Sequence, residues 1–434
     1  MRYCILGAGV QGSATAAVVA RAGDAEAIVL ADRDARLADR VAEKIGCDVL
    51  TTAATDAADV ASIVRAADGC DIILNLVDPD FNGQARKAAL QAGCHYIDSA
   101  ASLDFMMDVG FRRHVPDDEG FRAAGLCALV MSGFSPGVTN ALTRRTTDSF
   151  DEVEAIYVRL AYPEELWVDG NEVAHAWRPH WSPEGMVRDF AQPSMVLHSG
   201  ELTLMGPWAN REVFDFGKGM GKRVLTSHSH EEAATLPVFI GKGIGECDFL
   251  YAVNDQVATL IATGFGDPDR EVELAGGTKV KPFDVLMALA RRPAETAFFD
   301  ETPDRVRSRQ DIQCAISIEV VGRKHGIRER IVTAWDRNDS SALRVRLFEH
   351  FGTVNVWVAV PMLASARLVA RGDVPSGVTV PEQLDPELFL RELTVLQYPL
   401  DLREERVVLP DGPLAEVRAT ANPPNPTPLE RRPV

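Results

Sequence analysis

Apolar runs and helical patterns alternate along the first 131 residues of the chain. Each run is short and nearly uninterrupted, as in strands buried on both faces, and the segments between the runs carry apolar residues at helical spacing. This alternation predicts an α/β fold that begins with a Rossmann-type, doubly wound parallel sheet, with ligands at the carboxyl ends of the strands. The expected strands cover residues 3–6, 27–31, 49–50, 70–77, 95–98 and 127–131, and the expected helices cover residues 13–21, 36–45, 60–67, 82–92 and 110–124.

The pattern changes near residue 151, where apolar and polar residues begin to alternate as in half-buried strands. Residues 312–321 and 328–335 flank a Gly-containing turn and predict a β-hairpin. We therefore expect an inserted α+β domain with a mixed or antiparallel sheet and few helices. Its other strands are expected at 152–162, 195–204, 212–216, 249–253 and 257–263, and one of its helices at 282–292.

Helical patterns return after residue 341. The segment 354–370 is apolar on most faces, so it is expected to pack back onto the first domain, and 386–393 predicts a further helix. The predicted organisation is a dinucleotide-binding domain formed by 1–140 and 341–400, with a substrate and dimerisation domain at 141–340. Residues 421–434 are rich in proline and charge, which predicts a disordered tail.

The first expected strand runs into a Gly-x-Gly-x-x-Gly motif formed by Gly7, Gly9 and Gly12. In a strand–turn–helix context the first glycine permits the tight turn, the second lets a pyrophosphate approach the backbone, and the third lets the helix pack closely on the strand. The helix N-terminus, which also includes Val10 and Gln11, would offer free N–H groups to the phosphates.

Asp32 ends the second expected strand, 20 residues after the motif, where an acid can accept hydrogen bonds from the adenosine ribose. A carboxylate there favours NAD, because it repels the 2′-phosphate of NADP. Arg33 follows directly and could receive that phosphate, so NADP stays open as the cofactor.

The charge balance and the cysteine content limit the classes of binding partner that we expect. The 45 Lys and Arg residues against 63 Asp and Glu residues give a formal net charge of −18, which argues against nucleic acid. The seven cysteines form no CxxC pair and fit a reducing, cytoplasmic setting. We also expect no membrane partner, since the sequence contains neither a signal-peptide pattern nor an apolar stretch of membrane-spanning length.

A polar and aromatic segment at 175–185, HAWRPHWSPEG, is the main candidate for substrate chemistry. Arg178 could hold a carboxylate through a bidentate pair, and His175 or His180 could act as acid or base. Its two tryptophans could wall an aliphatic chain or a cation, and Ser182 before Pro183 predicts a helix start. Alternatively, the segment has no functional role: its aromatic residues pack into the hydrophobic core and its arginine is exposed to solvent.

Ser227-His228-Ser229-His230 forms a second cluster. It can be interpreted as part of a zinc site, as a substrate-lining loop or as an ordinary surface loop; we favour the last and expect no metal, because hydride transfer to nicotinamide needs none. Nucleophile-elbow, P-loop and HExxH motifs are absent from the sequence, which leaves hydrolase and kinase chemistry without support.

Several segments together resemble the saccharopine dehydrogenase-like family, and particularly its lysine 6-dehydrogenase members. They are GAGVQG at 7–12, the segment around residues 75–100, GFSPGVTN at 133–140, HAWRPHWSPEGMV at 175–187 and GDVPSGVTVPEQL at 372–384. The resemblance implies a dinucleotide-binding domain, an inserted substrate domain and a returning C-terminal helix. It also implies that the nicotinamide lies among residues 77–81, 98–99 and 134–136, including Val77, Asp78, Ser99, Ser135 and Pro136.

The resemblance further implies hydride transfer at a carbon that bears nitrogen, through an imine. Arg178, His180, Trp181 and Ser182 are then expected to face an amino acid or amine substrate, and His180 or Asp98 is expected to be the base. Independently of the resemblance, we also expect His228 and Phe134 to contact the substrate. Asp98-Ser99-Ala100-Ala101 departs from the Ser- or Tyr-rich strand end of saccharopine-forming members, which leaves the amine open. A carboxylated-polyamine dehydrogenase of the carboxynorspermidine type and a non-catalytic NAD(P) sensor remain alternatives, and a homodimer is expected.

Overall fold

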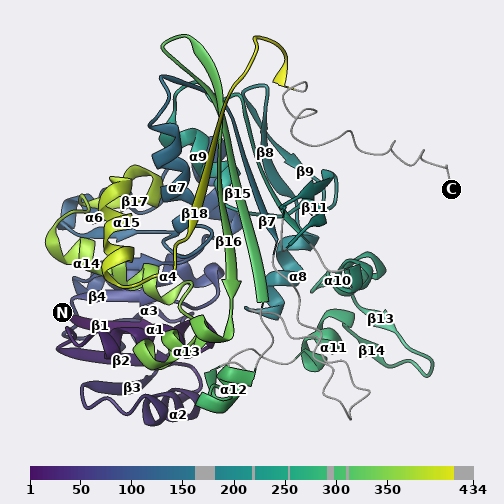
Figure 1. Cartoon of the computed structure of the whole chain (residues 1–434). Helices are drawn as coiled ribbons and strands as arrows, with labels where there is room; N and C mark the ends of the chain where they lie inside the picture. The colour runs from purple at the N-terminus through teal and green to yellow at the C-terminus, as the bar shows by residue number, and fades with distance from the viewer. Residues whose placement is uncertain (162–180, 218–219, 253–254, 291–297, 309–311, 415–434) are drawn as a thin grey trace.

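The protein was analysed as a computed structural model, which describes the chain except residues 162–180, 218–219, 253–254, 291–297, 309–311 and 415–434. Two large sheets organise it (Figure 1). All neighbouring strands of the first sheet are parallel, in the order β17-β6-β5-β4-β1-β2-β3. Its strands are β1 (Arg2–Leu6), β2 (Ala27–Asp32), β3 (Leu50–Ala54), β4 (Ile72–Asn75), β5 (His95–Asp98), β6 (Cys127–Leu129) and β17 (Gly377–Thr379).

Helices cover both faces of this sheet. On β1, Tyr3 and Ile5 join one apolar core with α1, α2 and α14, whereas Cys4 and Leu6 join a second core with α3 and α4. This is the two-sided burial that the uninterrupted apolar runs predict. The helices of this region are α1 (Val10–Ala22), α2 (Ala35–Ile45), α3 (Val60–Ala66), α4 (Asn82–Ala92), α5 (Leu103–Met107), α6 (Asp118–Ala124) and α7 (Val138–Thr147), with a 3₁₀ turn η1 (Pro79–Phe81) and a π turn η2 (Asp108–Arg112).

The second sheet is mixed, because β7 is parallel to β12 and the other neighbouring strands are antiparallel. Its main path is β10-β11-β12-β7-β15-β16-β18, and the β8–β9 hairpin joins it at β12. Long strands β15, β16 and β18 run side by side in Figure 1. The strands are β7 (Glu152–Ala161), β8 (Ser194–His198), β9 (Glu201–Met205), β10 (Arg211–Asp215), β11 (Lys222–Ser227), β12 (Glu246–Ala252), β15 (Ile312–Lys324), β16 (Ile327–Asp339) and β18 (Leu402–Val408).

Short helices lie between the strands of the second sheet along the chain, which then returns to the first sheet. The former are α8 (Pro183–Ala191), α9 (Glu232–Ile240), α10 (Asp255–Leu260), a π turn η3 (Ile261–Phe265), α11 (Pro282–Leu289) and α12 (Pro303–Ser308), with a small ribbon of β13 (Val272–Glu273) and β14 (Lys279–Val280). The returning elements, beside the first sheet in Figure 1, are α13 (Ser341–Phe351), α14 (Ala359–Arg371), the 3₁₀ turn η5 (Pro381–Gln383) and α15 (Pro386–Val395).

The predicted fold class is confirmed, and so is the hairpin of β15 and β16. Three local predictions were wrong. Residues 257–263 form α10 and η3 instead of a strand, because a short apolar run fits either period. Residues 195–204 form a hairpin, since Ser199 and Gly200 both adopt positive φ and turn the chain. The expected helix at 110–124 is interrupted between η2 and α6, where Pro116 lies.

Three further observations concern a helix, the tail and the cysteines. Helix α9 is missing from the sequence-based prediction, and Pro237 lies inside it. The tail at 421–434 lies outside the described residues. All seven cysteines are unpaired.

Candidate active site

The glycine-rich turn between β1 and α1 has the geometry of a dinucleotide cradle. Gly7 adopts φ +94°, and a Cβ on Gly12 would lie 1.7 Å from the Gly7 carbonyl oxygen, so both positions require glycine. A Cβ on Gly9, by contrast, would meet nothing within 4 Å. The space that a side chain would fill at Gly9 therefore lies open at the N-terminus of α1, where backbone N–H groups and the helix dipole favour a pyrophosphate.

Asp32 lies at the ribose end of this cradle, as the sequence predicts. Its carboxylate accepts hydrogen bonds from the Ala8 N–H at 2.6 Å and the Asp34 N–H at 2.8 Å. Arg33, the next residue in the sequence after Asp32, is exposed. On the phosphate side, the Asn355 amide approaches the Val10 carbonyl and the Gln11 side chain, both at 3.4 Å, so the loop before α14 touches the start of α1. The cradle thus fits NAD or NADP, which supply the redox chemistry as hydride carriers.

The loops that follow β4, β5 and β6 meet at the carboxyl edge of the parallel sheet. A Cβ on Gly133 would lie 3.0 Å from the Ser99 carbonyl oxygen, which shows how closely the last two loops approach. Val77 packs partly buried against the core. Phe134 packs against Trp335 and Trp357, with ring centroids 5.3 and 6.4 Å apart. The edge therefore brings together the segments expected around the nicotinamide.

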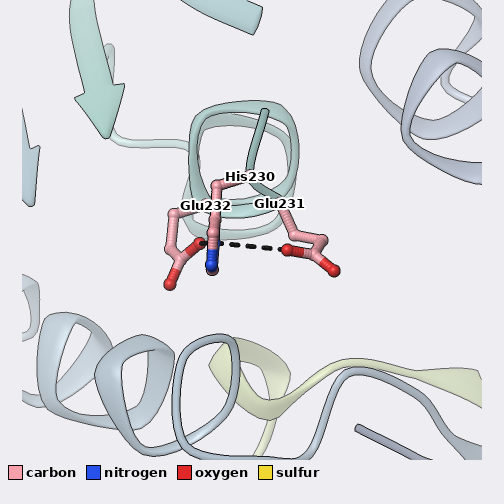
Figure 2. Close-up of side chains that lie close together, drawn as sticks. All are labelled: His230, Glu231 and Glu232. Atoms are coloured by element: carbon pink, nitrogen blue, oxygen red, sulfur yellow. Dashed lines mark hydrogen bonds and ion pairs between the residues drawn. The ribbon is translucent and has the colours of Figure 1, made fainter. Parts of the chain in front are cut away.

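Three titratable side chains at the start of α9 point into this region. Figure 2 shows the His230 ring between the side chains of Glu231 and Glu232. His230 Nδ1 lies 3.2 Å from Glu231 Oε2 and forms a short contact with Glu232 Oε2. Both carboxylates also accept bonds from the loops of the parallel sheet: Glu231 from the Ala101 N–H at 2.7 Å, and Glu232 from the hydroxyls of Ser135 and Thr139 at 2.7 and 2.9 Å.

This arrangement gives a buried imidazolium. Burial alone would lower the pKa of His230, but the charges of Glu232 and Glu231 raise it to about 9. Burial would raise the pKa of Glu232, yet His230 and the two hydroxyl donors lower it. The pKa of Glu231 is raised by burial. The ligand atoms of these three residues lie close enough together to hold a metal ion, and the single charge of the imidazolium faces both carboxylates.

Two further acids with raised pKa values lie near the trio. Burial raises the pKa of Asp189, on α8, well above its ordinary value, with Glu231 adding to the effect. Burial likewise raises the pKa of Glu382, on η5, to about 7; its carboxylate accepts a 3.1 Å bond from the Asn140 amide. The edge of the sheet therefore carries more carboxyl groups than the cations facing it can neutralise.

Asp98, one of the two expected bases, lies at the end of β5 and is 2% exposed. Its two oxygens accept bonds from the Met131 N–H at 2.6 Å and the Tyr96 hydroxyl at 2.9 Å. Burial raises the pKa of Asp98 to about 7. The side chain is thus committed to joining β5 and β6, and its assignment as a base stays a prediction.

The WSPEG segment lies at the start of α8, with Ser182 as the N-cap that accepts the Gly185 N–H at 3.1 Å. Trp181 packs so closely that a Cβ on Gly185 would lie 2.6 Å from its ring. One turn later Arg188 donates to Asp78 at 2.7 Å and Asp80 at 2.6 Å, across the gap between the two sheets. The predicted segment is therefore tied to the predicted nicotinamide loop.

The remaining residues predicted to bind substrate lie either outside the described residues or in a buried position. Arg178, His175 and His180 lie outside the described residues. His228 is 3% exposed and packs edge-on against Phe190 at 4.4 Å, and burial lowers its pKa well below the ordinary value. The surface-loop interpretation of residues 227–230 was wrong, since Ser227, His228 and Ser229 are buried and the His230 side chain is only 12% exposed.

The sequence-based prediction missed the members of the acidic cluster beyond Asp98. These residues are Asp189, Glu231, Glu232 and Glu382, together with the bridging residue Arg188, whereas His230 was noted only as part of the Ser-His-Ser-His segment. The available signal was the pair of acids that directly follows Ser-His-Ser-His, at the start of an unrecognised helix.

Comparisons with known proteins agree with this geometry. Residues 3–117 match the family described as the saccharopine dehydrogenase NADP binding domain. The chain is 26% identical to carboxyaminopropylagmatine dehydrogenase of Synechocystis sp. over 92% of this chain and 96% of that protein. It is also 26% identical to carboxynorspermidine synthase of Vibrio cholerae serotype O1, over 82% and 83% of the two chains. Saccharopine dehydrogenase (L-Glu forming) of Saccharomyces cerevisiae shares the fold, with a TM-score of 0.64 at 12% identity over 94% of this chain and 99% of that chain.

The cradle and the parallel sheet together define an NAD(P)-binding domain. More narrowly, residues 3–117 match the saccharopine dehydrogenase NADP binding domain, and the whole chain is similar to saccharopine dehydrogenase-like proteins, in line with the sequence resemblance. Within the part of the chain that the structure describes, no helix combines the length and the apolar character needed to span a membrane.

Proposed function

We propose that the protein oxidises and forms the secondary amine of a carboxylated polyamine, using NAD or NADP. The observation that carries this proposal is the acidic cluster at the carboxyl edge of the parallel sheet, formed by Asp98, Asp189, Glu231, Glu232 and Glu382. Buried carboxyl groups are costly unless a cation faces them. A polyamine supplies several ammonium groups, whereas an ordinary amino acid supplies one or two.

The reaction that fits is reversible. In the oxidative direction a secondary amine, NAD(P)⁺ and water give an amine, an aldehyde, NAD(P)H and a proton, and the bound nicotinamide accepts the hydride. The chain has to hold the reacting nitrogen without its proton, exclude bulk water and orient the carbon. Deep burial of the cluster between two sheets suits these tasks, since electrostatic interactions strengthen where water is excluded.

The similarity to proteins named for carboxyaminopropylagmatine and carboxynorspermidine supports this proposal. It favours the carboxylated polyamines over the lysine 6-dehydrogenase type expected from the sequence. Arg178 remains our proposed anchor for the substrate carboxylate, near Trp181 and Ser182. We also propose a cytoplasmic homodimer, which size-exclusion chromatography with light scattering would test.

A panel assay tests the proposed function. Carboxynorspermidine, carboxyaminopropylagmatine, saccharopine and lysine are each incubated with NAD⁺ or NADP⁺, and reduced cofactor is followed by absorbance. We expect turnover of a carboxylated polyamine at a kcat/KM at least tenfold above that of saccharopine and lysine. Turnover of lysine alone would overturn the polyamine assignment. Tight cofactor binding without turnover of any compound would instead favour a sensor.

A further inference from the structure

We propose that His230 transfers the proton at the reacting C–O bond and that Glu232 is its positioning residue. This inference rests on the proposed function, and it assigns the acid–base role to a residue that the sequence-based expectation did not select. Its basis is the geometry of the His230 ring, the anchoring of Glu232 and the way both are tied to the loops expected around the nicotinamide.

The His230 ring is held on two sides. Its Nδ1 faces the carboxylates of Glu231 and Glu232, while its face stacks on Phe249 of β12 with centroids 3.9 Å apart and planes 12° apart. Among the described residues, no hydrogen bond engages Nε2, and 12% of the side chain is exposed. The ring therefore has one nitrogen fixed and the other available, which is the arrangement of an oriented acid–base histidine.

Glu232 is fixed by groups outside its own helix. Its Oε1 accepts from Ser135 and Thr139, which belong to the loop after β6 and the start of α7, and its side chain is fully buried. This loop is the segment expected beside the nicotinamide. The carboxylate consequently fixes the imidazole relative to the place where hydride transfer occurs, and does so without needing to touch the substrate.

In the direction of amine formation, His230 protonates the oxygen that leaves as water. The amine adds to the aldehyde carbon and gives a carbinolamine. The His230 imidazolium donates its Nε2 proton to the carbinolamine hydroxyl, the C–O bond breaks, and water leaves with that proton. The nitrogen lone pair forms the C=N bond of an iminium ion, whose carbon then accepts the hydride. In the reverse direction neutral His230 takes a proton from the attacking water.

The alternatives fit the geometry less well. Both carboxylate oxygens of Asp98 accept hydrogen bonds, from the Tyr96 hydroxyl and the Met131 N–H. His228 is buried and packs against Phe190. His230 alone among these three combines an available ring nitrogen with a carboxylate that can stabilise its charged form. The groups facing it are Glu231 and Glu232 at the start of α9, Asp189 from α8 and His228 from the same loop. Asp98 interacts with Glu231, and Glu382 interacts with Glu232.

The test compares His230→Gln, Glu232→Gln and a matched control pair. The control is the exposed ion pair of His198 and Glu246, 2.9 Å apart on the second sheet, changed as His198→Gln and Glu246→Gln. Amine formation is assayed across pH with the amine and aldehyde released from the panel compound that wild-type protein oxidises. Dissociation constants for NAD(P)H and the histidine Cε1–H NMR resonances are measured in parallel.

His230→Gln should lower kcat by about 10²- to 10⁴-fold while changing the NAD(P)H dissociation constant less than threefold. The wild-type profile should fall as pH rises through about 9, because the acid form is needed. Glu232→Gln should move that limb and the His230 NMR titration to lower pH by about one unit or more, since it removes a charge that favours imidazolium. The control variants should leave both unchanged.

Two outcomes would overturn the inference separately from the function. If the wild-type protein is active and His230→Gln has the same kcat, His230 does not take part in the reaction. If the alkaline limb of the pH profile is the same in Glu232→Gln as in wild type, Glu232 does not position His230. Absence of wild-type turnover for every panel compound, with intact NAD(P)H binding, would overturn the proposed function and the acid–base role with it.

Discussion

Arg188 Nη2 lies 2.7 Å from Asp78 Oδ2 and joins helix α8 to the loop after β4. A second ion pair, from Arg188 to Asp80 at 2.6 Å, strengthens the link. Both partners belong to elements expected around the cofactor and the substrate, so this bridge sets how the second sheet approaches the first. Its position at the boundary makes it relevant to ligand binding more than to the stability of either part.

Arg188→Ala should therefore raise KM and the NAD(P)H dissociation constant by about three- to tenfold. The free energy of unfolding should change by less than about 1 kcal/mol, because half-exposed ion pairs contribute little. Fluorescence titration and chemical denaturation measure the two quantities. The control is Arg122→Ala, which removes an ion pair within α6. Equal effects of the two variants on ligand binding would contradict the bridging role.

The glycine motif allows binding and folding to be separated. Gly9→Ala should keep the fold but weaken NAD(P)H binding at least tenfold, because its methyl group points into open space where the pyrophosphate is expected. Gly12→Ala should instead destabilise the protein by about 1–3 kcal/mol, since its Cβ would overlap the Gly7 carbonyl. Gly83→Ala, on α4 with open space around it, serves as the control for both measurements.

Glu382 should make stability depend on pH. Its pKa is raised by burial to about 7 in the folded protein, so the native state holds a proton that the unfolded chain releases at lower pH. The stability that this group contributes is therefore present below its unfolded pKa and is lost as pH rises towards about 7 and beyond. The Glu382→Gln side chain stays neutral at every pH. The free energy of unfolding of this variant, relative to wild type, should therefore rise by about 2 kcal/mol from pH 5 to pH 8.

Urea denaturation at the two pH values measures this difference. Glu387→Gln, on the exposed face of α15, is the matched control and should show no comparable trend. A constant difference between Glu382→Gln and wild type at both pH values would mean that Glu382 is ionised throughout. Its bond from Asn140 would then be made to a carboxylate at every pH.

Substrate binding should release protons. Burial raises the pKa of Asp189 and Glu231, and an ammonium group placed beside these carboxyls would favour their charged forms and lower both pKa values. Isothermal titration calorimetry of the panel polyamine, in two buffers of different ionisation enthalpy at pH 7, measures the number of protons released. Asp189→Asn should reduce that number. Uptake of protons would contradict the cationic-substrate proposal.

The first domain was predictable because its signals are local. The runs that become β1, β2, β4 and β5 are apolar on both faces and end in turn residues, and the cradle follows from the spacing of Gly7, Gly9 and Gly12. These features depend on neighbours within a few residues. The parallel sheet and its ligand edge could therefore be derived without knowing what packs around them.

The acidic site was not predictable in the same way. Glu231 and Glu232 look like solvent-exposed acids at a helix start, and their burial comes from contacts with residues far away in sequence. The Glu231 bond to Ala101 joins residues 130 positions apart, and the Glu232 bond to Ser135 joins residues 97 positions apart. Sequence spacing carries no record of such contacts, so the Ser-His-Ser-His segment suggested an ordinary surface loop.

Strands β17 and β18, which complete the two sheets, both come from the C-terminal part of the chain. During synthesis, β6 and β16 must therefore wait with an unpaired edge until those strands have left the ribosome. Unpaired edges bind other extended chains and promote aggregation. Neither sheet can close before these late strands are synthesised, and we expect the nascent protein to depend on chaperones for longer than a chain whose domains are contiguous in sequence.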